Sequence, residues 1–240
     1  MIAARALDGI PEIRPGDDLG ALLRGRVADG EVAVIAQKVV SKAEGRIVEL
    51  DDVDPGPEAL RLAREQGKDD ARHVQVVLDE SAAIVRAERG ILICRTRHGF
   101  VCANAGVDSS NTEPGTLVLL PEDPDASARR IRAAANPRAA VVIADSFGRA
   151  WRHGQADVAI GIAGLAPLED WRGRRDSHGR ELKATWIATA DQAASAADLA
   201  RGKDTREPIV VLRGLERFVT REDGPGAAAL VRPGEEDLFR

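Results

Sequence analysis

The sequence predicts a mixed α+β fold, and three observations lead to it. Short apolar runs of strand length are interspersed with longer segments of helical spacing, and turns rich in Gly and Pro separate them. Hydrophobic residues make up 44% of the 240-residue chain, which is enough for a sizeable core. Aromatic residues are only 3%, so we expect Val, Ile, Leu and Ala to fill that core. Without an internal repeat or a dividing linker, we predict one domain over residues 1–220 and a tail over residues 221–240.

The first third of the chain predicts a central strand. Residues 7–18, LDGIPEIRPGDD, form a turn-rich connector, and Asp18 is placed to cap a short helix over Leu19–Val27. After the Asp29-Gly30 turn, the run EVAVIA is apolar on both faces, as expected for a strand inside a sheet.

Polar residues gather where that strand ends. Binding functions concentrate at such strand exits in layered folds, although isolated lysines there are also consistent with solvated surface charges. The residues in question are Gln37, Lys38, Ser41, Lys42 and Glu44.

The middle of the chain predicts a scaffold followed by a hairpin and a small-residue loop. Residues 55–87 have helical spacing, and we expect His73 on their surface. Two short strands, residues 91–95 and 100–103, meet through the turn at His98-Gly99. The loop that follows is suited either to an Asx-rich turn or to a metal and phosphate site, since it offers backbone amides with oxygen ligands. Its polar members are Asn104, Asp108, Ser109, Ser110 and Asn111.

The stretch 139–161, AAVVIADSFGRAWRHGQADVAIG, is the most informative part of the sequence. A strand over residues 117–120 precedes it, then a helix capped by Asp123 whose arginines we expect in solvent. The apolar run predicts a buried strand that brings Asp145 and Ser146 to a surface crevice, where they are suited to a hard cation. The alternative is an Asx-turn that merely closes the strand. We expect Arg149, Arg152 and His153 to lie nearby and to donate hydrogen bonds to a phosphate or carboxylate group.

The last part of the chain adds an arginine-rich loop and two further elements. The loop is consistent with an anionic ligand or with a subunit contact. Its arginines are Arg172, Arg174, Arg175 and Arg180. A helix is predicted over residues 190–199 and a strand over residues 208–215.

Charge and cysteine content exclude several classes of protein. The formal net charge of −5 provides no overall attraction to nucleic acid. Cys94 and Cys102 lack the spacing of a zinc site or a disulfide framework, and we expect buried thiols. The N-terminal residues lack the apolar core of a signal peptide, and no stretch is long enough to span a membrane. We therefore expect a cytoplasmic protein.

Six motifs together resemble the coenzyme F420:gamma-glutamyl ligase family. The match extends from about Leu7 to Leu215 and is carried by the combination rather than by one motif. The motifs are LDGIPEIRPGDD, VVSKAEGR, HGFVCANAGVDSSN, DPDASARR, IADSFGRAWRHGQADVAIG and VVLRGL.

The resemblance implies a homodimeric αβ enzyme, with sheets and flanking helices, that joins L-glutamate to coenzyme F420-0 at the expense of GTP. It also implies a further γ-linked glutamate, two divalent ions (Mg²⁺ or Mn²⁺) and K⁺. Carried over by motif, Asp108, Asp145 and Ser146 are implied metal ligands, and Lys42, Asp108 and Asp145 the catalytic residues. The implied nucleotide site consists of Ile10, Pro11, Glu12, Ile13, Gln37, Lys38, Lys42 and Asn111.

Some positions depart from the family pattern. Ser146 replaces the usual Thr but keeps a hydroxyl, whereas Gln192 stands where an acid is frequent, and residues 202–207 are less glycine-rich. Two alternatives therefore stay open: a nucleotide-dependent ligase or kinase for another anionic substrate, and a module that binds F420 or nucleotide without turnover. The ending LVRPGEEDLF resembles a junction to a nitroreductase-like domain found in many relatives.

Overall fold

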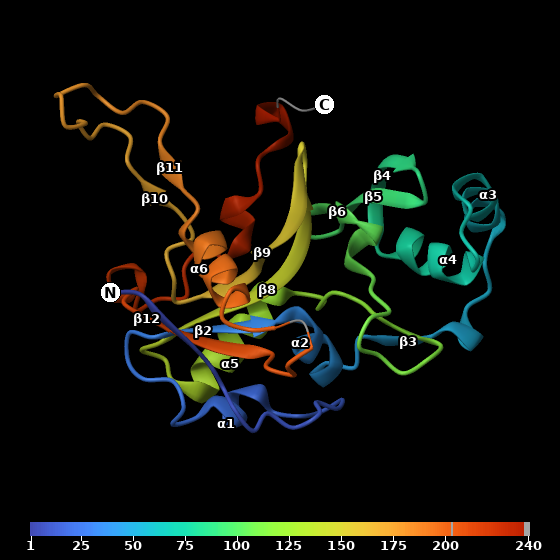
Figure 1. Cartoon of the computed structure of the whole chain (residues 1–240), viewed down its shortest axis with the longest axis horizontal. Helices are drawn as coiled ribbons and strands as arrows, with labels where there is room; N and C mark the ends of the chain where they lie inside the picture. The colour runs from blue at the N-terminus through green and yellow to red at the C-terminus, as the bar shows by residue number, and fades with distance from the viewer. Residues whose placement is uncertain (203, 238–240) are drawn as a thin grey trace.

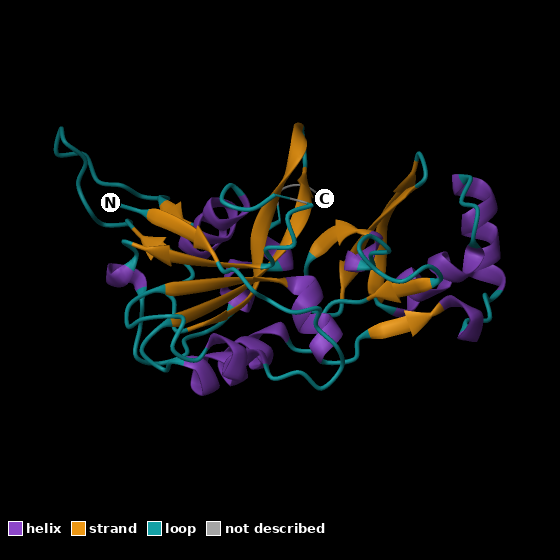
Figure 2. Ribbon diagram, turned by 60° about the horizontal axis from the view of Figure 1, so that its bottom comes forward, coloured by secondary structure: helices purple, strands orange, loops and turns teal. Residues whose placement is uncertain are grey.

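A computed structural model describes residues 1–202 and 204–237, and its largest sheet has five strands (Figures 1 and 2). In spatial order they are β1 (Ala3–Ala6), β12 (Ile209–Arg213), β2 (Val32–Ala36), β8 (Ala140–Arg149) and β9 (Arg152–Ala163). β2 and β8 run parallel, and the other neighbours are antiparallel. The central place of β2 confirms the expectation from its two apolar faces.

Helices cover both faces of this sheet. Successive side chains of a strand point to opposite faces, so Ala33 and Ile35 pack with α1 (Leu19–Leu23) and α5 (Pro124–Ala135). Val32 and Val34 pack instead with α6 (Thr189–Asp198). Each fully buried Val or Ile contributes roughly 1.5–3 kcal/mol by leaving water, which makes β2 the anchor of the fold.

A second region lies beside the sheet and has its own apolar core (Figure 1). Its helices α3 and α4 pack against each other and against short strands. The elements are β3 (Ile47–Glu49), α3 (Pro57–Gln66), α4 (Ala71–Asp79), β4 (Ser81–Glu88), β5 (Ile91–Thr96), β6 (Val101–Ala103) and β7 (Thr116–Val118). Helix α2 (Gln37–Ala43) follows β2 without a loop and leads the chain toward this region.

Two hairpins project from the main sheet. The long β8–β9 hairpin rises well beyond it, as Figure 1 shows in yellow. A second arm is closed at its base by the two-stranded pair β10 (Glu169–Asp170) and β11 (Trp186–Ile187). Short 3₁₀ turns complete the described chain at Leu50–Asp52, Asn104–Gly106, Glu216–Phe218, Ala227–Leu230 and Gly234–Glu236.

Several local expectations are confirmed and some are wrong. Asp18 and Asp123 cap α1 and α5 through bonds from Ala21 N (3.0 Å) and Ala126 N (2.8 Å). The predicted helical stretch 55–87 is wrong at its end, because Ser81–Glu88 pairs with β5 as a strand. His73 is not on the surface: it is half-buried, and its Nε2 has no hydrogen-bond partner within the described residues.

Arg132 is the largest departure from the expected exposed arginines of α5. Its residue is 4% exposed, and its guanidinium donates to Ala139 O (2.8 Å) and pairs with Asp223 at 2.6 Å. Two backbone carbonyls of residues 220 and 221 accept from the same group. Arg132 thereby fixes residues 220–223 to the main sheet, and Ala227 is buried beyond them. Of the predicted tail 221–240, residues 238–240 lie outside the described residues.

The two cysteines of the chain face each other on neighbouring strands of the second region. Cys94 and Cys102 are free and buried, opposite each other on β5 and β6. Burial raises the pKa of Cys102 to about 12, and the nearby charge of Asp145 adds to the shift. Within residues 1–202 and 204–237, no helix has the length and apolar character needed to cross a membrane.

Candidate functional site

The register of two parallel strands places Lys38 and Asp145 side by side. Ala36 at the end of β2 pairs with Ala144 in β8, so the next residues of both chains leave the pair at the same edge. β2 turns at once into α2, which carries Lys38 on its first turn, while β8 continues with Asp145. Crevices beyond the carboxyl ends of parallel strands are where layered αβ folds bind ligands. The positions predicted at two separate strand exits therefore meet in one place.

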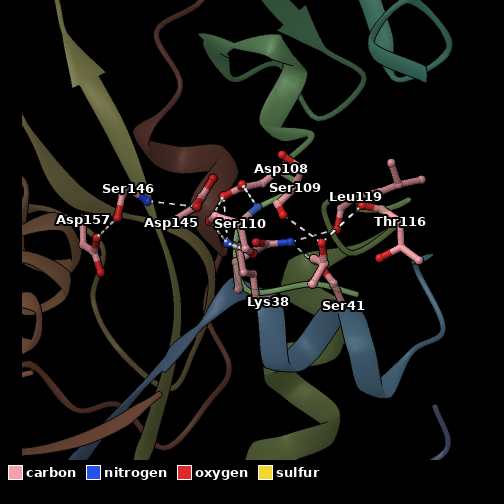
Figure 3. Close-up of polar contacts among 12 residues, drawn as sticks. Lys38, Ser41, Asp108, Ser109, Ser110, Thr116, Leu119, Asp145, Ser146 and Asp157 are labelled. Atoms are coloured by element: carbon pink, nitrogen blue, oxygen red, sulfur yellow. Dashed lines mark hydrogen bonds and ion pairs between the residues drawn. The ribbon is translucent and has the colours of Figure 1, made fainter. Parts of the chain in front are cut away.

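Asp108 reaches this edge from the second region. Its backbone bridges Val118 in both directions (3.0 and 2.9 Å), and the loop before it turns sharply through positive φ values at Asn104 and Ala105. The Lys38 ammonium pairs with Asp108 Oδ2 at 2.9 Å and also donates to Ser110 O at 2.6 Å (Figure 3). This ion pair connects the two regions across the site.

The loop also shapes the charge of Asp108. Burial raises the pKa of its carboxyl, but the hydrogen bonds from Lys38 and from the Ser110 amide (2.7 Å) outweigh burial and lower it overall. Asp108 is therefore ionised and already compensated. Asn111 follows on the same loop as an exposed residue with φ 55°.

Asp145 is the exception among the acids of the site. The pKa of its carboxyl is raised to about 7: burial is the main cause and the charges of Asp108 and Asp157 add to it, while the hydrogen bond from the Ser146 amide (2.9 Å) and the charge of Lys38 oppose it. In the described part of the chain, Asp145 forms no ion pair within 4 Å. Because the charge of Asp108 contributes to the raised pKa of Asp145, the two predicted metal ligands lie close to each other, as Figure 3 shows.

Asp157 and Arg201 complete the site, and neither was predicted from the sequence as a site residue. Asp157 is fully buried and accepts from Ser146 Oγ at 2.6 Å, while Arg201 forms an ion pair with its second oxygen. The signal for Asp157 lay in the hairpin: a turn at residues 150–151 places Ser146 opposite Asp157. Arg201 had no such signal, because its contact depends on a separate return of the chain.

Among the residues that the structure describes, Lys38 forms an ion pair with Asp108 and Arg201 forms one with Asp157, whereas Asp145 forms none. Carboxylate and hydroxyl oxygens in a partly buried cluster with excess negative charge fit a hard divalent ion. As arranged, no three Asp, Glu, His or Cys side chains of the described residues converge on a ready-made metal position. The donor types and the charge fit such an ion, but Asp108 is occupied by Lys38.

The predicted nucleotide residues lie around α2. Lys42 pairs with Glu12 at 2.6 Å, which joins the segment 10–13 to the helix. Gln37 is buried, and its amide nitrogen donates to Ser41 Oγ (2.7 Å) and Leu119 O (2.8 Å), so both of its protons are in use. Within the segment 10–13, Ile13 packs in the main core, Ile10 is half-buried, and Pro11 is exposed.

Two arginine-bearing segments do not join the acids. β8 continues past Asp145, so Arg149, Arg152 and His153 are exposed at the hairpin tip, and placing them beside the acids was wrong. Arg149 is four positions further along the strand than Asp145, which places their backbones about 13 Å apart. The arginine-rich loop forms the projecting arm, and Arg172 contacts other residues of that same arm. Arg172 pairs with Asp170 (2.7 Å) and stacks over Trp186 (4.1 Å).

The departure at Gln192 also lies elsewhere. Gln192 lies on α6 and lines a pocket together with Ile2 and Phe218. The adjacent Asp191 accepts from Ala159 N at 2.9 Å, next to an irregularity in the β8–β9 register. Asp191 therefore has a structural role, and neither residue belongs to the Asp108–Asp145–Asp157 group.

Comparisons with known proteins give a consistent result over the whole chain. A family model described as F420-0:Gamma-glutamyl ligase matches residues 9–214. A protein of Methanothermobacter thermautotrophicus is 42% identical over 251 residues, covering 100% of this chain and 99% of the relative. Proteins of Methanopyrus kandleri (46% over 237 residues; 95% and 94%) and Methanocaldococcus jannaschii (43% over 219 residues; 89% and 86%) are also similar. All three relatives are named coenzyme F420:L-glutamate ligase.

Proposed function

The chain belongs to the F420-0:gamma-glutamyl ligase family, and on this basis we propose that it joins L-glutamate to coenzyme F420-0 with GTP as the energy source. The names of the relatives support the ligase reaction. The use of GTP, an acyl-phosphate intermediate and a further γ-linked glutamate are the finer parts of the proposal. The observation that carries it is the uncompensated carboxyl of Asp145 beside Lys38 and Asp108.

The chemistry explains why such a site is needed. A carboxylate is a poor acyl donor at neutral pH, because its charge repels nucleophiles and oxide cannot leave. Transfer of the γ-phosphoryl group of GTP to the terminal carboxylate of F420-0 gives an acyl phosphate, which the glutamate amine attacks as phosphate leaves. In phosphoryl transfer the protein mainly positions the reactants and neutralises charge.

Different residues of the site are proposed to neutralise phosphate charge, to position the nucleotide and to hold the metal ions. Lys42 neutralises phosphate charge from α2, and Lys38 adds a second ammonium on the same helix. Glu12, held by Lys42, places residues 10–13 along the nucleotide together with Gln37 and Asn111. Asp108, Asp145 and Ser146 would hold two divalent ions, Mg²⁺ or Mn²⁺, which would supply further neutralisation of phosphate charge. A monovalent cation such as K⁺ belongs to the same proposal.

The direct test is a product assay. The protein is incubated with F420-0, GTP, glutamate and Mn²⁺, and mass spectrometry is used to find a product heavier by one glutamyl unit. A second unit would indicate the γ-linked addition. Release of GDP in equal amount is expected, and ATP in place of GTP serves as the control. Absence of the glutamyl product with every nucleotide would refute the proposal.

Two alternatives give different results in simple binding experiments. A ligase or kinase for another anionic substrate would be stabilised equally by ATP and GTP with Mn²⁺, whereas we expect thermal stabilisation by GTP alone. A module without turnover would bind F420-0 or GTP but form no product. The Gln192 departure motivated that module; Gln192 lies on α6, and the product assay decides between the module and the ligase.

The proposal extends to assembly and location. We expect a homodimer, as the family resemblance implies, and light scattering coupled to size exclusion would detect it. The proposed reaction uses small molecules only, with no nucleic acid or membrane partner, and we assign it to the cytoplasm, where GTP and glutamate are available.

A further inference from the structure

The hydroxyl of Ser146 is backed by a buried acid. Ser146 and Asp157 are direct partners across the β8–β9 hairpin, and Ser146 Oγ donates to Asp157 Oδ1 at 2.6 Å. Asp157 is fully buried, whereas Ser146 is only half-buried. In Figure 3, Ser146 and Asp157 lie on one side of Asp145, and Lys38 and Asp108 lie on the other. Asp157 therefore contacts the hydroxyl from behind, away from the paired Lys38 and Asp108.

This hydrogen bond determines what Ser146 offers to a cation. A serine hydroxyl has one proton and two lone pairs, and a cation requires the lone pairs. Because the proton points to a charged acceptor, the bond is stronger than one between neutral groups and holds the hydroxyl in one orientation. Toward its other neighbours the Ser146 oxygen then acts as an acceptor.

Asp157 is itself held in place. Arg201 pairs with Asp157 Oδ2 and donates to Pro208 O at 3.0 Å, and its side chain is 9% exposed. Each carboxylate oxygen thus has a donor, and Ser195 Oγ donates to the backbone carbonyl of the same residue at 2.9 Å. With both oxygens and the backbone fixed, the carboxylate cannot rotate away from Ser146 without breaking a charged contact.

We infer that Asp157, fixed by Arg201, is a positioning residue that turns the Ser146 oxygen toward the divalent cation; this rests on the proposed function. Asp157 touches neither nucleotide nor acceptor in this role and acts only through Ser146. Outer carboxylates of this kind change metal affinity by about 10- to 100-fold when removed. No sequence motif alone assigned this role to Asp157 or Arg201.

The test is a double-mutant cycle on Mn²⁺ binding, measured by electron paramagnetic resonance with GDP present. Asp157→Asn keeps the shape but replaces the charged acceptor, and we expect Mn²⁺ affinity to fall about 10- to 100-fold. In a Ser146→Ala background the same change should cost less than about threefold, because the hydroxyl is already absent. In the product assay, raising Mn²⁺ should restore turnover of Asp157→Asn, since only the metal requirement increases.

Ser195→Ala is the matched control, because it removes a hydrogen bond to the backbone carbonyl of Asp157 and leaves the contacts of the carboxylate in place. It should leave Mn²⁺ affinity within about twofold of the unchanged protein. If Asp157→Asn does not fold by circular dichroism, Arg201→Lys keeps the charge but loses the paired geometry, and it should weaken Mn²⁺ binding at least about threefold.

Two results would overturn the inference. Asp157→Asn could bind Mn²⁺ like the unchanged protein, or lose the same factor with and without the Ser146 hydroxyl. Unchanged Mn²⁺ affinity in Arg201→Lys, used where Asp157→Asn does not fold, would overturn it in the same way. Failure of the proposed function would look different, because the unchanged protein would then neither bind Mn²⁺ with GDP nor form the glutamyl product.

Discussion

The two predicted metal ligands reach the site on contrasting parts of the molecule. Asp145 lies on β8, fixed by the ladders to β2 and β9 and by the buried core beneath them. Asp108 lies on a loop of the second region, after a turn with two non-glycine residues at positive φ. The sheet provides the Asp145 carboxyl, which forms no ion pair with any residue that the structure describes, whereas the loop provides the Asp108 carboxyl, which is already paired with Lys38.

That difference indicates how the site responds to a ligand. A divalent ion at Asp145 would relieve the cost of its burial without displacing an existing partner. The same ion at Asp108 would compete with the Lys38 ammonium, and displacement would release that ammonium toward a phosphate. We therefore expect Asp145 to govern whether ions bind, and Asp108 to link ion binding to Lys38 and the second region.

The largest expected effect is that of Asp145→Asn on turnover. This change removes the charge and not the volume, and we expect the rate of glutamyl product formation to fall about 1,000-fold, near the upper range for loss of one electrostatic contact. Circular dichroism should be unchanged. Turnover within tenfold of the unchanged protein would remove Asp145 from the mechanism.

Asp108→Asn sharpens the comparison with a smaller effect. The loop still presents an oxygen, and Lys38 is freed, so part of the lost charge balance is recovered. We expect a fall of about 100-fold in the rate of product formation, with a lower Mn²⁺ affinity measured by titration. If Asp108→Asn lowered the rate as much as Asp145→Asn, the position of a carboxylate on the sheet or on the loop would make no difference to its role.

The third effect is on stability, and its sign depends on pH. Because the pKa of Asp145 is raised to about 7 in the folded protein, the unfolded chain loses its proton first as pH rises. Folding stability is therefore undiminished at low pH and falls as pH approaches 7. In protein freed of metal with a chelator, Asp145→Asn should raise the unfolding free energy by about 2 kcal/mol at pH 8.

The same experiment contains its own control. At pH 5 the gain from Asp145→Asn should be smaller, because the carboxyl is then still protonated in the folded protein. Urea unfolding at the two pH values measures both gains. An equal gain at pH 5 and pH 8 would contradict a raised pKa for the Asp145 carboxyl. Addition of Mn²⁺ at pH 8 should stabilise only the unchanged protein.

Much of the fold was predictable because local and global preferences agree. β2 is apolar on both faces and is central, and the caps Asp18 and Asp123 start helices where expected. The predictions were wrong where contacts between distant segments determine the secondary structure or the burial of a residue. Residues 81–88 are compatible with a helix by composition, but pairing with β5 makes them a strand. Arg132 resembles any charged helix residue, yet it is buried by carbonyls from distant segments.

The candidate site shows the same division. Asp108, Asp145 and Lys38 were found because each follows a recognisable strand, and the parallel register then brings two of these exits together. Asp157 was missed because β8 was expected to end at Ser146 and Gly148 instead of continuing into a hairpin. Arg201 depends on a contact with a residue 44 positions away, which periodicity cannot indicate.

The smallest expected effect concerns the pair that joins the segment 10–13 to α2. Lys42→Gln removes a cation proposed to face phosphate, and we expect the KM for GTP to rise about tenfold with a smaller change in kcat. Glu12→Gln removes only its exposed partner, since Glu12 is 72% exposed in the pair. Exposed pairs contribute under about 1 kcal/mol, so the KM should change less than about fivefold. Equal effects of the two changes would mean that Lys42 acts only by holding Glu12, and steady-state kinetics with varied GTP decides between these roles.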